Sequence, residues 1–117
     1  MALVLALVDD LFFQAKMMET ARHVGVELKT VVSGDALVEA VARTQPALVI
    51  VDLNARHGPL EAIEQLRASG VAAPLVAFLS HVQVELAERA RAAGCRDVMP
   101  RSKFTQNLAT ILARAKS

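Results

Sequence analysis

Hydrophobic residues in this chain are gathered in short continuous runs, separated by longer amphipathic segments. Three runs are apolar throughout, as in strands that helices cover on both faces: Leu3–Val8, Ala47–Val51 and Leu75–Leu79. A fourth run, Val26–Val32, alternates with polar residues and is expected nearer an edge of the sheet. The fifth candidate strand, Asp97–Met99, is short. The pattern therefore predicts five strands.

The segments between these runs carry apolar residues at helical spacing. Five helices are predicted, over Phe13 to Val24, Ala36 to Val41, Leu60 to Leu66, Leu86 to Ala93 and Leu108 to Ala115. Candidate start and stop residues are Asp35 and Pro59 at two helix starts, and Gly25, Pro46, Gly70 and Gly94 after four helix ends. Strand and helix thus alternate five times, which predicts a parallel sheet with right-handed crossovers.

The length of 117 residues suits one domain, covering residues 1–117. Five strands and five helices in that length match the flavodoxin-like (βα)5 fold, a doubly wound parallel α/β sheet with strand order 2-1-3-4-5. No linker, internal repeat or low-complexity segment interrupts the pattern.

Composition and charge narrow the range of functions. With 54% hydrophobic and 21% charged residues, the chain is not intrinsically disordered. Its formal net charge is +1, with six Lys/Arg against nine Asp/Glu in residues 1–80 and seven against three in residues 81–117. The basic C-terminal third is expected to be a solvated face. No nucleic-acid binding is expected, because Phe104 is the only aromatic residue in that third.

Cysteine usage and the N-terminal segment bear on localisation. Cys95 is the only cysteine, so it forms no internal disulfide, and we expect a small buried residue in a reducing, intracellular setting. The opening MALVLALV lacks a basic leading segment and runs directly into Asp9 and Asp10, unlike a signal peptide. No apolar run approaches the ~18 residues of a membrane span. We expect a cytoplasmic domain with no membrane partner.

Candidate functional residues follow the strands. In a sheet of this kind the site lies outside the carboxyl ends of the strands, near the switch between the first and third. The residues expected there are Asp9, Asp10, Asp52, Ser80, His81, Arg101, Ser102 and Lys103. Three carboxylates this close are unfavourable without a cation, and oxygen-only ligands suit Mg²⁺. The alternative is that each aspartate only caps the following helix.

Four segments carry a resemblance to a known family. They are LALVDDLFF, QPALVIVDL, PLVAFLS and AAGCRDVMPRSKF. In order and spacing they resemble parts of response-regulator receiver (CheY-like) domains. Those parts are the first strand with its acidic pair, the third strand ending at the phosphoacceptor aspartate, the fourth strand with its terminal Thr or Ser, and the Gly-Ala-…-Lys-Pro segment. The resemblance covers essentially the whole chain.

The resemblance implies roles for individual residues. Asp52 would accept a phosphoryl group, and Ser80 would bond one of its oxygens. Asp9, Asp10 and Asp52 would hold Mg²⁺ together with the backbone carbonyl of Asn54. The arrangement is chemically sensible, because phosphoryl transfer needs an in-line nucleophile and strong neutralisation of the phosphate oxygens.

The resemblance also implies a function and partners. The chain is expected to be a stand-alone receiver domain in phosphorelay signal transduction, not an enzyme. A histidine kinase or phosphotransfer protein would phosphorylate it, and it would act by binding an unidentified downstream protein. A homodimer could form through the face of the fourth helix, fifth strand and fifth helix, which includes Leu86, Ala90, Val98 and Leu108, some of them expected in the core.

Several positions depart from the family pattern. Arg101 stands where the family has lysine, and Ser102 replaces the following proline. We therefore expect the Arg101–Ser102 bond to be trans, since a cis bond before a residue other than proline costs about 2.5–4 kcal/mol. Lys103 is a candidate to turn inward in place of the missing ammonium. Val98 replaces the switch aromatic, and His81 could crowd the phosphoryl pocket.

Two alternatives stay open at this point. One is a pseudo-receiver, the same fold used as an interaction module without phosphotransfer. The other is a small-cofactor binder on this fold. The second is disfavoured because the chain has no GxGxxG turn, no Asp-x-His-x-x-Gly signature at Asp52, and no Trp or Tyr. Ser80 and His81 are not expected to form a catalytic dyad, because neighbours at a strand end point apart.

Overall fold

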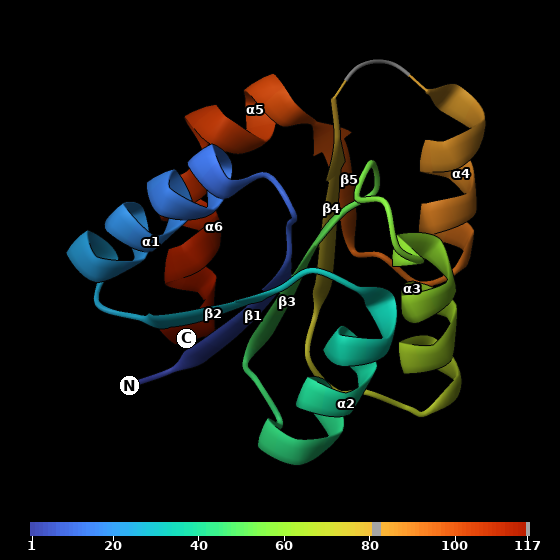
Figure 1. Cartoon of the computed structure of the whole chain (residues 1–117), viewed down its shortest axis with the longest axis horizontal. Helices are drawn as coiled ribbons and strands as arrows, with labels where there is room; N and C mark the ends of the chain where they lie inside the picture. The colour runs from blue at the N-terminus through green and yellow to red at the C-terminus, as the bar shows by residue number, and fades with distance from the viewer. Residues whose placement is uncertain (81–82, 117) are drawn as a thin grey trace.

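A computed structural model of the chain describes residues 1–80 and 83–116. Its strands are β1 (Leu3–Leu7), β2 (Glu27–Val31), β3 (Leu48–Asp52), β4 (Leu75–Leu79) and β5 (Asp97–Pro100). Its helices are α1 (Leu11–Val24), α2 (Gly34–Thr44), α3 (Pro59–Ala68), α4 (Val84–Ala92), α5 (Arg101–Gln106), α6 (Leu108–Ala113) and the 3₁₀ turn η1 (Arg114–Lys116). Every strand pair is parallel, in the order β2-β1-β3-β4-β5 (Figure 1). The predicted flavodoxin-like topology is confirmed.

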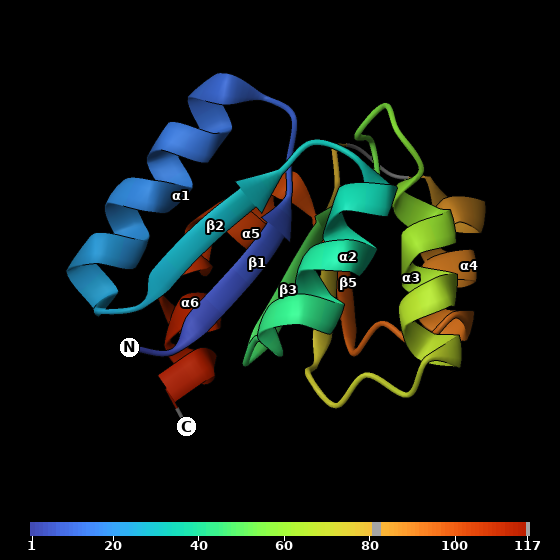
Figure 2. The ribbon, with the colours of Figure 1, turned by 60° about the horizontal axis from the view of Figure 1, so that its bottom comes forward.

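Helices cover both faces of the sheet. Figure 2 shows α2, α3 and α4 on one side, with α1, α5 and α6 on the other. Alternate residues of β1 enter different hydrophobic clusters, Val4 and Ala6 beneath α1 and α6 and Leu5 and Leu7 beneath α2 and α3. This double burial explains the continuous apolar runs. The alternating strand β2 lies at an edge, as predicted.

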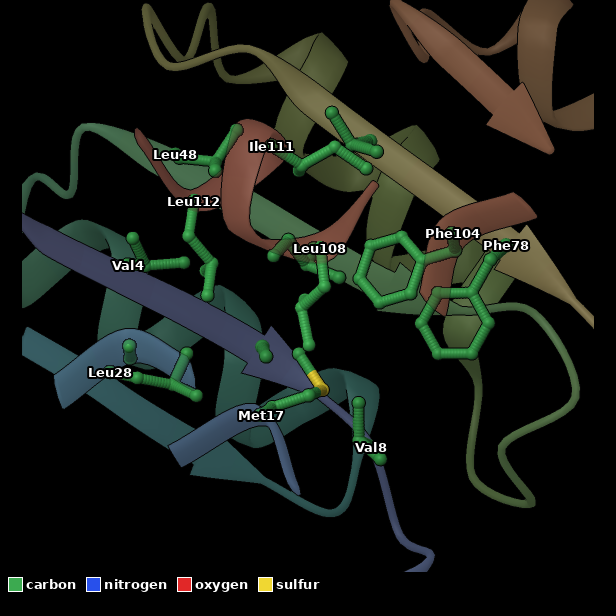
Figure 3. Close-up of a cluster of buried hydrophobic side chains, with 14 of the residues drawn as sticks. Val4, Val8, Met17, Leu28, Leu48, Phe78, Phe104, Leu108, Ile111 and Leu112 are labelled. Carbon is green, nitrogen blue, oxygen red and sulfur yellow. The ribbon is translucent and has the colours of Figure 1, made fainter. Parts of the chain in front are cut away.

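Three phenylalanines join the first cluster to the carboxyl edge of the sheet. Figure 3 shows Phe78 of β4 and Phe104 of α5 packed together within that cluster. Their ring centroids lie 4.3 Å apart in a stacked arrangement, and Phe13 of α1 meets Phe78 edge-on at 5.4 Å. Phe104 therefore anchors α5 against the sheet, which fixes the start of that helix at the end of β5.

The start of α2 differs from the prediction. Asp35 lies inside the first turn, and the capping residue is Ser33, whose hydroxyl accepts a bond from Ala36 N at 3.1 Å. The helix begins early because Gly34 packs against the loop before α3. A Cβ on Gly34 would lie 2.3 Å from the backbone oxygen of Gly58. Gly34 N also donates to His57 O at 2.7 Å.

The C-terminal segment also differs from the single predicted helix. The structure has α5 before α6, with Asn107 between them, whose backbone and side-chain nitrogens both donate to Lys103 O. Only Phe104 is buried within α5, so the segment carries no apolar periodicity. Its existence could not be predicted from the hydrophobic pattern.

Burial of the other singled-out residues agrees with the sequence. Cys95 is buried, as expected of a small core residue. Of the possible dimer face, Ala90 and Leu108 belong to the core, while Leu86 and Val98 are partly buried.

Among residues 1–80 and 83–116, no helix has the length and apolar character needed to cross a membrane.

Candidate functional site

Three carboxylates lie at the carboxyl edge of the sheet. Asp9 and Asp10 follow β1, and Asp52 is the last residue of β3, the strand paired with β1. Asp52 is only 5% exposed. The charges of Asp9 and Asp10 both act to raise the pKa of Asp52, so both carboxylates lie within electrostatic range of it.

Asp10 both caps a helix and forms an ion pair. Its Oδ1 accepts a bond from Phe13 N at 3.1 Å, which caps α1, and its Oδ2 accepts one from an Arg101 guanidinium nitrogen at 2.9 Å. The bond from Phe13 and the contact with Arg101 lower the pKa of Asp10. The capping alternative is therefore true of Asp10, which also pairs with Arg101.

Arg101, the residue predicted to stand where the family has lysine, follows β5 directly. It is the first residue of α5, and its guanidinium carbon lies 4.1 Å from the ring centroid of Phe13 and 6.0 Å from that of Phe78. No peptide bond in the described ranges is cis, which confirms the trans expectation for Arg101–Ser102. Lys103 is exposed on α5 and is not turned inward, contrary to expectation.

A second arginine, Arg56, engages Asp9. Asp9 Oδ2 accepts bonds from Arg56 N at 2.9 Å and from Arg56 Nε at 3.4 Å. The Arg56 side chain is charged and 77% exposed, so the pattern of hydrophobic residues gives no indication of its position. The only sequence signal for it is its place in the loop that follows Asp52, at the functional edge. Arg56 was not among the predicted site residues.

Asp52 is held by the turn that follows it. Its Oδ1 accepts a bond from Asn54 N at 2.9 Å. Burial raises the pKa of Asp52, while that bond and the charge of Arg101 act to lower it, and the net direction is upward. An uncompensated negative charge is thus unfavourable here, and Asp52 gains from any cation brought to the edge.

The Asn54 side chain links two loops of the site. Its Oδ1 accepts a bond from Ser80 N at 2.5 Å, and its Nδ2 donates to Gln83 Oε1 at 2.8 Å. Ser80 lies just beyond β4, at the edge where it was predicted. The sequence prediction concerned only the Asn54 carbonyl and missed this side-chain bridge. His81, the candidate for crowding the pocket, lies outside the described residues.

The site's oxygen donors match Mg²⁺ in chemistry. Carboxylates and a backbone carbonyl are ligands that this ion accepts, and they share one edge of the sheet. Within residues 1–80 and 83–116, however, no three His, Cys, Asp or Glu side chains are grouped as a metal-binding set. Asp9 and Asp10 are paired with arginines instead. A cation at this edge would therefore share Asp9 and Asp10 with the arginines or replace one of them.

Comparison with known proteins identifies the fold. No protein-family model and no curated protein matches the chain. The chemotaxis protein CheY4 of Vibrio cholerae superposes with a TM-score of 0.85 at 19% identity, over 98% of each chain. The receiver domain of a Pseudomonas aeruginosa sensor histidine kinase, whose structure has a magnesium ion in the active-site cleft, gives 0.76 at 18% identity, over 95% of this chain and 97% of that one.

A longer protein matches as well. NtrX of Brucella abortus gives a TM-score of 0.82 at 22% identity, covering 98% of this chain but 26% of its own. The chain thus spans about a quarter of NtrX. The chain shares the receiver-domain fold, as its sequence resemblance predicted.

Proposed function

We propose that this chain is a receiver domain in phosphorelay signalling that accepts a phosphoryl group on Asp52 and acts by binding other proteins. The observation that carries the proposal is the environment of Asp52. Its buried carboxylate ends the strand next to β1, beside Asp9 and Asp10 and within the electrostatic influence of Arg101. The receiver-domain fold that the chain shares with the compared structures supports the proposal.

In the proposed reaction, a carboxylate oxygen of Asp52 attacks the phosphorus of a phosphohistidine on a kinase or phosphotransfer protein. A new P–O bond forms, the P–N bond breaks, and the imidazole nitrogen keeps the electron pair. Arg101 can bond phosphoryl oxygens through two parallel donors, and the Ser80 hydroxyl is the second proposed contact. Asp9, Asp10, Asp52 and the Asn54 carbonyl would hold Mg²⁺, which when bound neutralises phosphoryl charge.

The start of α1 provides a surface for the protein phosphodonor. Leu11 is 74% exposed and Phe12 is 91% exposed, directly after the acidic pair. Large apolar side chains this exposed beside a polar site are typical of protein contacts. We propose that the phosphodonor protein covers Leu11 and Phe12 while it presents its phosphohistidine to Asp52.

The direct test is the intact mass of the protein after incubation with a phosphoramidate and Mg²⁺. We expect one phosphoryl adduct on the native chain and none on Asp52→Asn. A matched variant, Asp35→Asn on the exposed first turn of α2, should keep the adduct. Absence of an adduct from folded native protein would contradict phosphoacceptor function.

That negative result would instead favour a pseudo-receiver that binds partners without phosphotransfer. Two observations support this second candidate. First, Asp9 and Asp10 already form ion pairs with arginines. Second, the partly buried Val98 stands where the family pattern has an aromatic switch residue. The cofactor-binder alternative gains no comparable support from the site.

A further inference from the structure

We infer that Arg56 and Arg101 are built-in counter-ions of the acidic site, which compete with Mg²⁺ for Asp9 and Asp10. The inference rests on the proposed function, because it concerns how the same edge of the sheet is controlled. It identifies one residue, Arg56, that was not among the predicted site residues. It also gives Arg101 a second role besides contact with the phosphoryl group.

Charge balance is the first support. Asp9, Asp10 and Asp52 bring up to three negative charges to one edge, and the two guanidinium groups bring the same +2 charge as a magnesium ion. Arginine stays protonated throughout the ordinary pH range. The acidic edge is therefore largely compensated by the chain's own side chains.

The hydrogen bonds show which carboxylate oxygens the two arginines hold. At Asp10, Oδ1 is used by the cap of α1, and Oδ2 is the atom bound to Arg101. At Asp9, Oδ2 accepts one bond from the main-chain N–H of Arg56 and a longer one from its side-chain Nε. Because each arginine bonds an oxygen that a cation would also bind, the two arginine pairs compete with Mg²⁺ for these carboxylates.

The two pairs should resist opening to different degrees. The Arg56 side chain is 77% exposed, and its longer Nε contact of 3.4 Å is weakened by solvent. The Arg101 side chain is 30% exposed, bonds Asp10 at 2.9 Å and stacks over Phe13. Partial burial and stacking strengthen a cationic contact. Arg101 is therefore the stronger competitor.

The test is calorimetric titration of Mg²⁺ into the full chain and into Arg56→Gln, Arg101→Gln and Arg43→Gln. Arg43 is the matched control, because it forms an exposed ion pair with Glu39 on α2 and its replacement removes the same charge. We expect the Mg²⁺ dissociation constant to fall about two- to fivefold in Arg56→Gln, the range of exposed ion pairs, and further in Arg101→Gln. Arg43→Gln should match the native chain.

A second substitution assigns any gain to the site. Adding Asp10→Asn to Arg101→Gln should remove the tighter binding. Circular dichroism checks folding, and the mostly exposed Arg56 side chain keeps one variant informative if Arg101→Gln unfolds. The inference is wrong if neither variant binds Mg²⁺ more tightly than Arg43→Gln, whether all bind equally or none binds.

Failure of this inference is separable from failure of the proposed function. The phosphoryl adduct on Asp52 is measured by mass in the same preparations. Tighter Mg²⁺ binding without an adduct would support arginine competition and refute phosphoacceptor function. An adduct with unchanged Mg²⁺ affinities would support phosphoacceptor function and refute arginine competition.

Discussion

Asp52 is the residue at which the requirements of stability and of the proposed chemistry conflict. Burial and the charges of Asp9 and Asp10 raise its pKa, so its ionised form is disfavoured in the folded protein relative to the unfolded chain. The stability associated with its raised pKa is fully present below the unfolded pKa and is lost as pH rises through the folded pKa. At neutral pH the charge is therefore a cost.

We accordingly predict that Asp52→Asn is more stable than the native chain at neutral pH without Mg²⁺. The expected gain is about 1 kcal/mol in the free energy of unfolding, the usual scale when a functional residue is replaced. The gain should shrink as pH falls through the folded pKa of Asp52. Urea unfolding at several pH values measures it, with Asp35→Asn as control. A gain that persists unchanged at acidic pH would show that Asp52 ionisation is not its cause.

Site residues at strand ends were predictable, and those in loops were not. Asp9, Asp10 and Asp52 follow continuous apolar runs, so parallel strands fix their common edge. Arg56 lies in a loop without periodicity, where only the folded backbone brings its N–H to Asp9. The inward turn expected of Lys103 failed for a related reason, since the start of α5 was not visible in the apolar pattern.

At the scale of elements, α2 packs against the loop between β3 and α3, which follows the proposed phosphoacceptor Asp52. Gly34 approaches Gly58 so closely that a Cβ on Gly34 would lie 2.3 Å from the backbone oxygen of Gly58. The backbone N–H of Gly34 also donates a hydrogen bond to His57 O. The same loop carries Asn54 and Arg56, which contact Asp52 and Asp9. Displacement of this loop should therefore reach the site.

We predict that Gly34→Ala destabilises the protein by about 1–3 kcal/mol, as for overpacked sites, and slows adduct formation at Asp52. Gly70→Ala is the matched control, because a Cβ there meets nothing within 4 Å and only its positive φ of 76° is strained. Thermal unfolding and timed mass spectra measure the two effects. An adduct rate in Gly34→Ala equal to that of Gly70→Ala would contradict the proposed link to the loop.

The elements themselves were predicted to different degrees. The runs that became β1, β3 and β4 were clear because they are buried on both faces. The split between α5 and α6 was not, because it depends on one buried residue, Phe104, and on Asn107 bonding back to Lys103. Hydrophobic periodicity arises where several residues of an element are buried at regular spacing. An element that buries a single side chain has no such periodicity and cannot be predicted from it.

At the scale of the whole molecule, the topology brings a polar site and an exposed apolar surface to the same edge. The acidic pair lies between β1 and α1, and α1 begins directly after it with Leu11 and Phe12. A small phosphodonor needs only the polar site. A protein phosphodonor is proposed to need both features, which allows the two parts of the proposal to be tested separately.

We predict that Phe12→Ala lowers phosphotransfer from a phosphorylated histidine-containing phosphotransfer protein about tenfold, the loss typical of an exposed aromatic anchor at an interface. Adduct formation from phosphoramidate should remain at the native rate, because Phe12 is 91% exposed and supports no core packing. Met18→Ala, at a half-exposed position further along α1, serves as the control. The donor protein is one chosen because it phosphorylates the native chain, and transfer is followed by intact mass. If Phe12→Ala accepts phosphate from that protein as fast as Met18→Ala does, the phosphodonor docks elsewhere, and the apolar start of α1 contributes nothing to phosphotransfer.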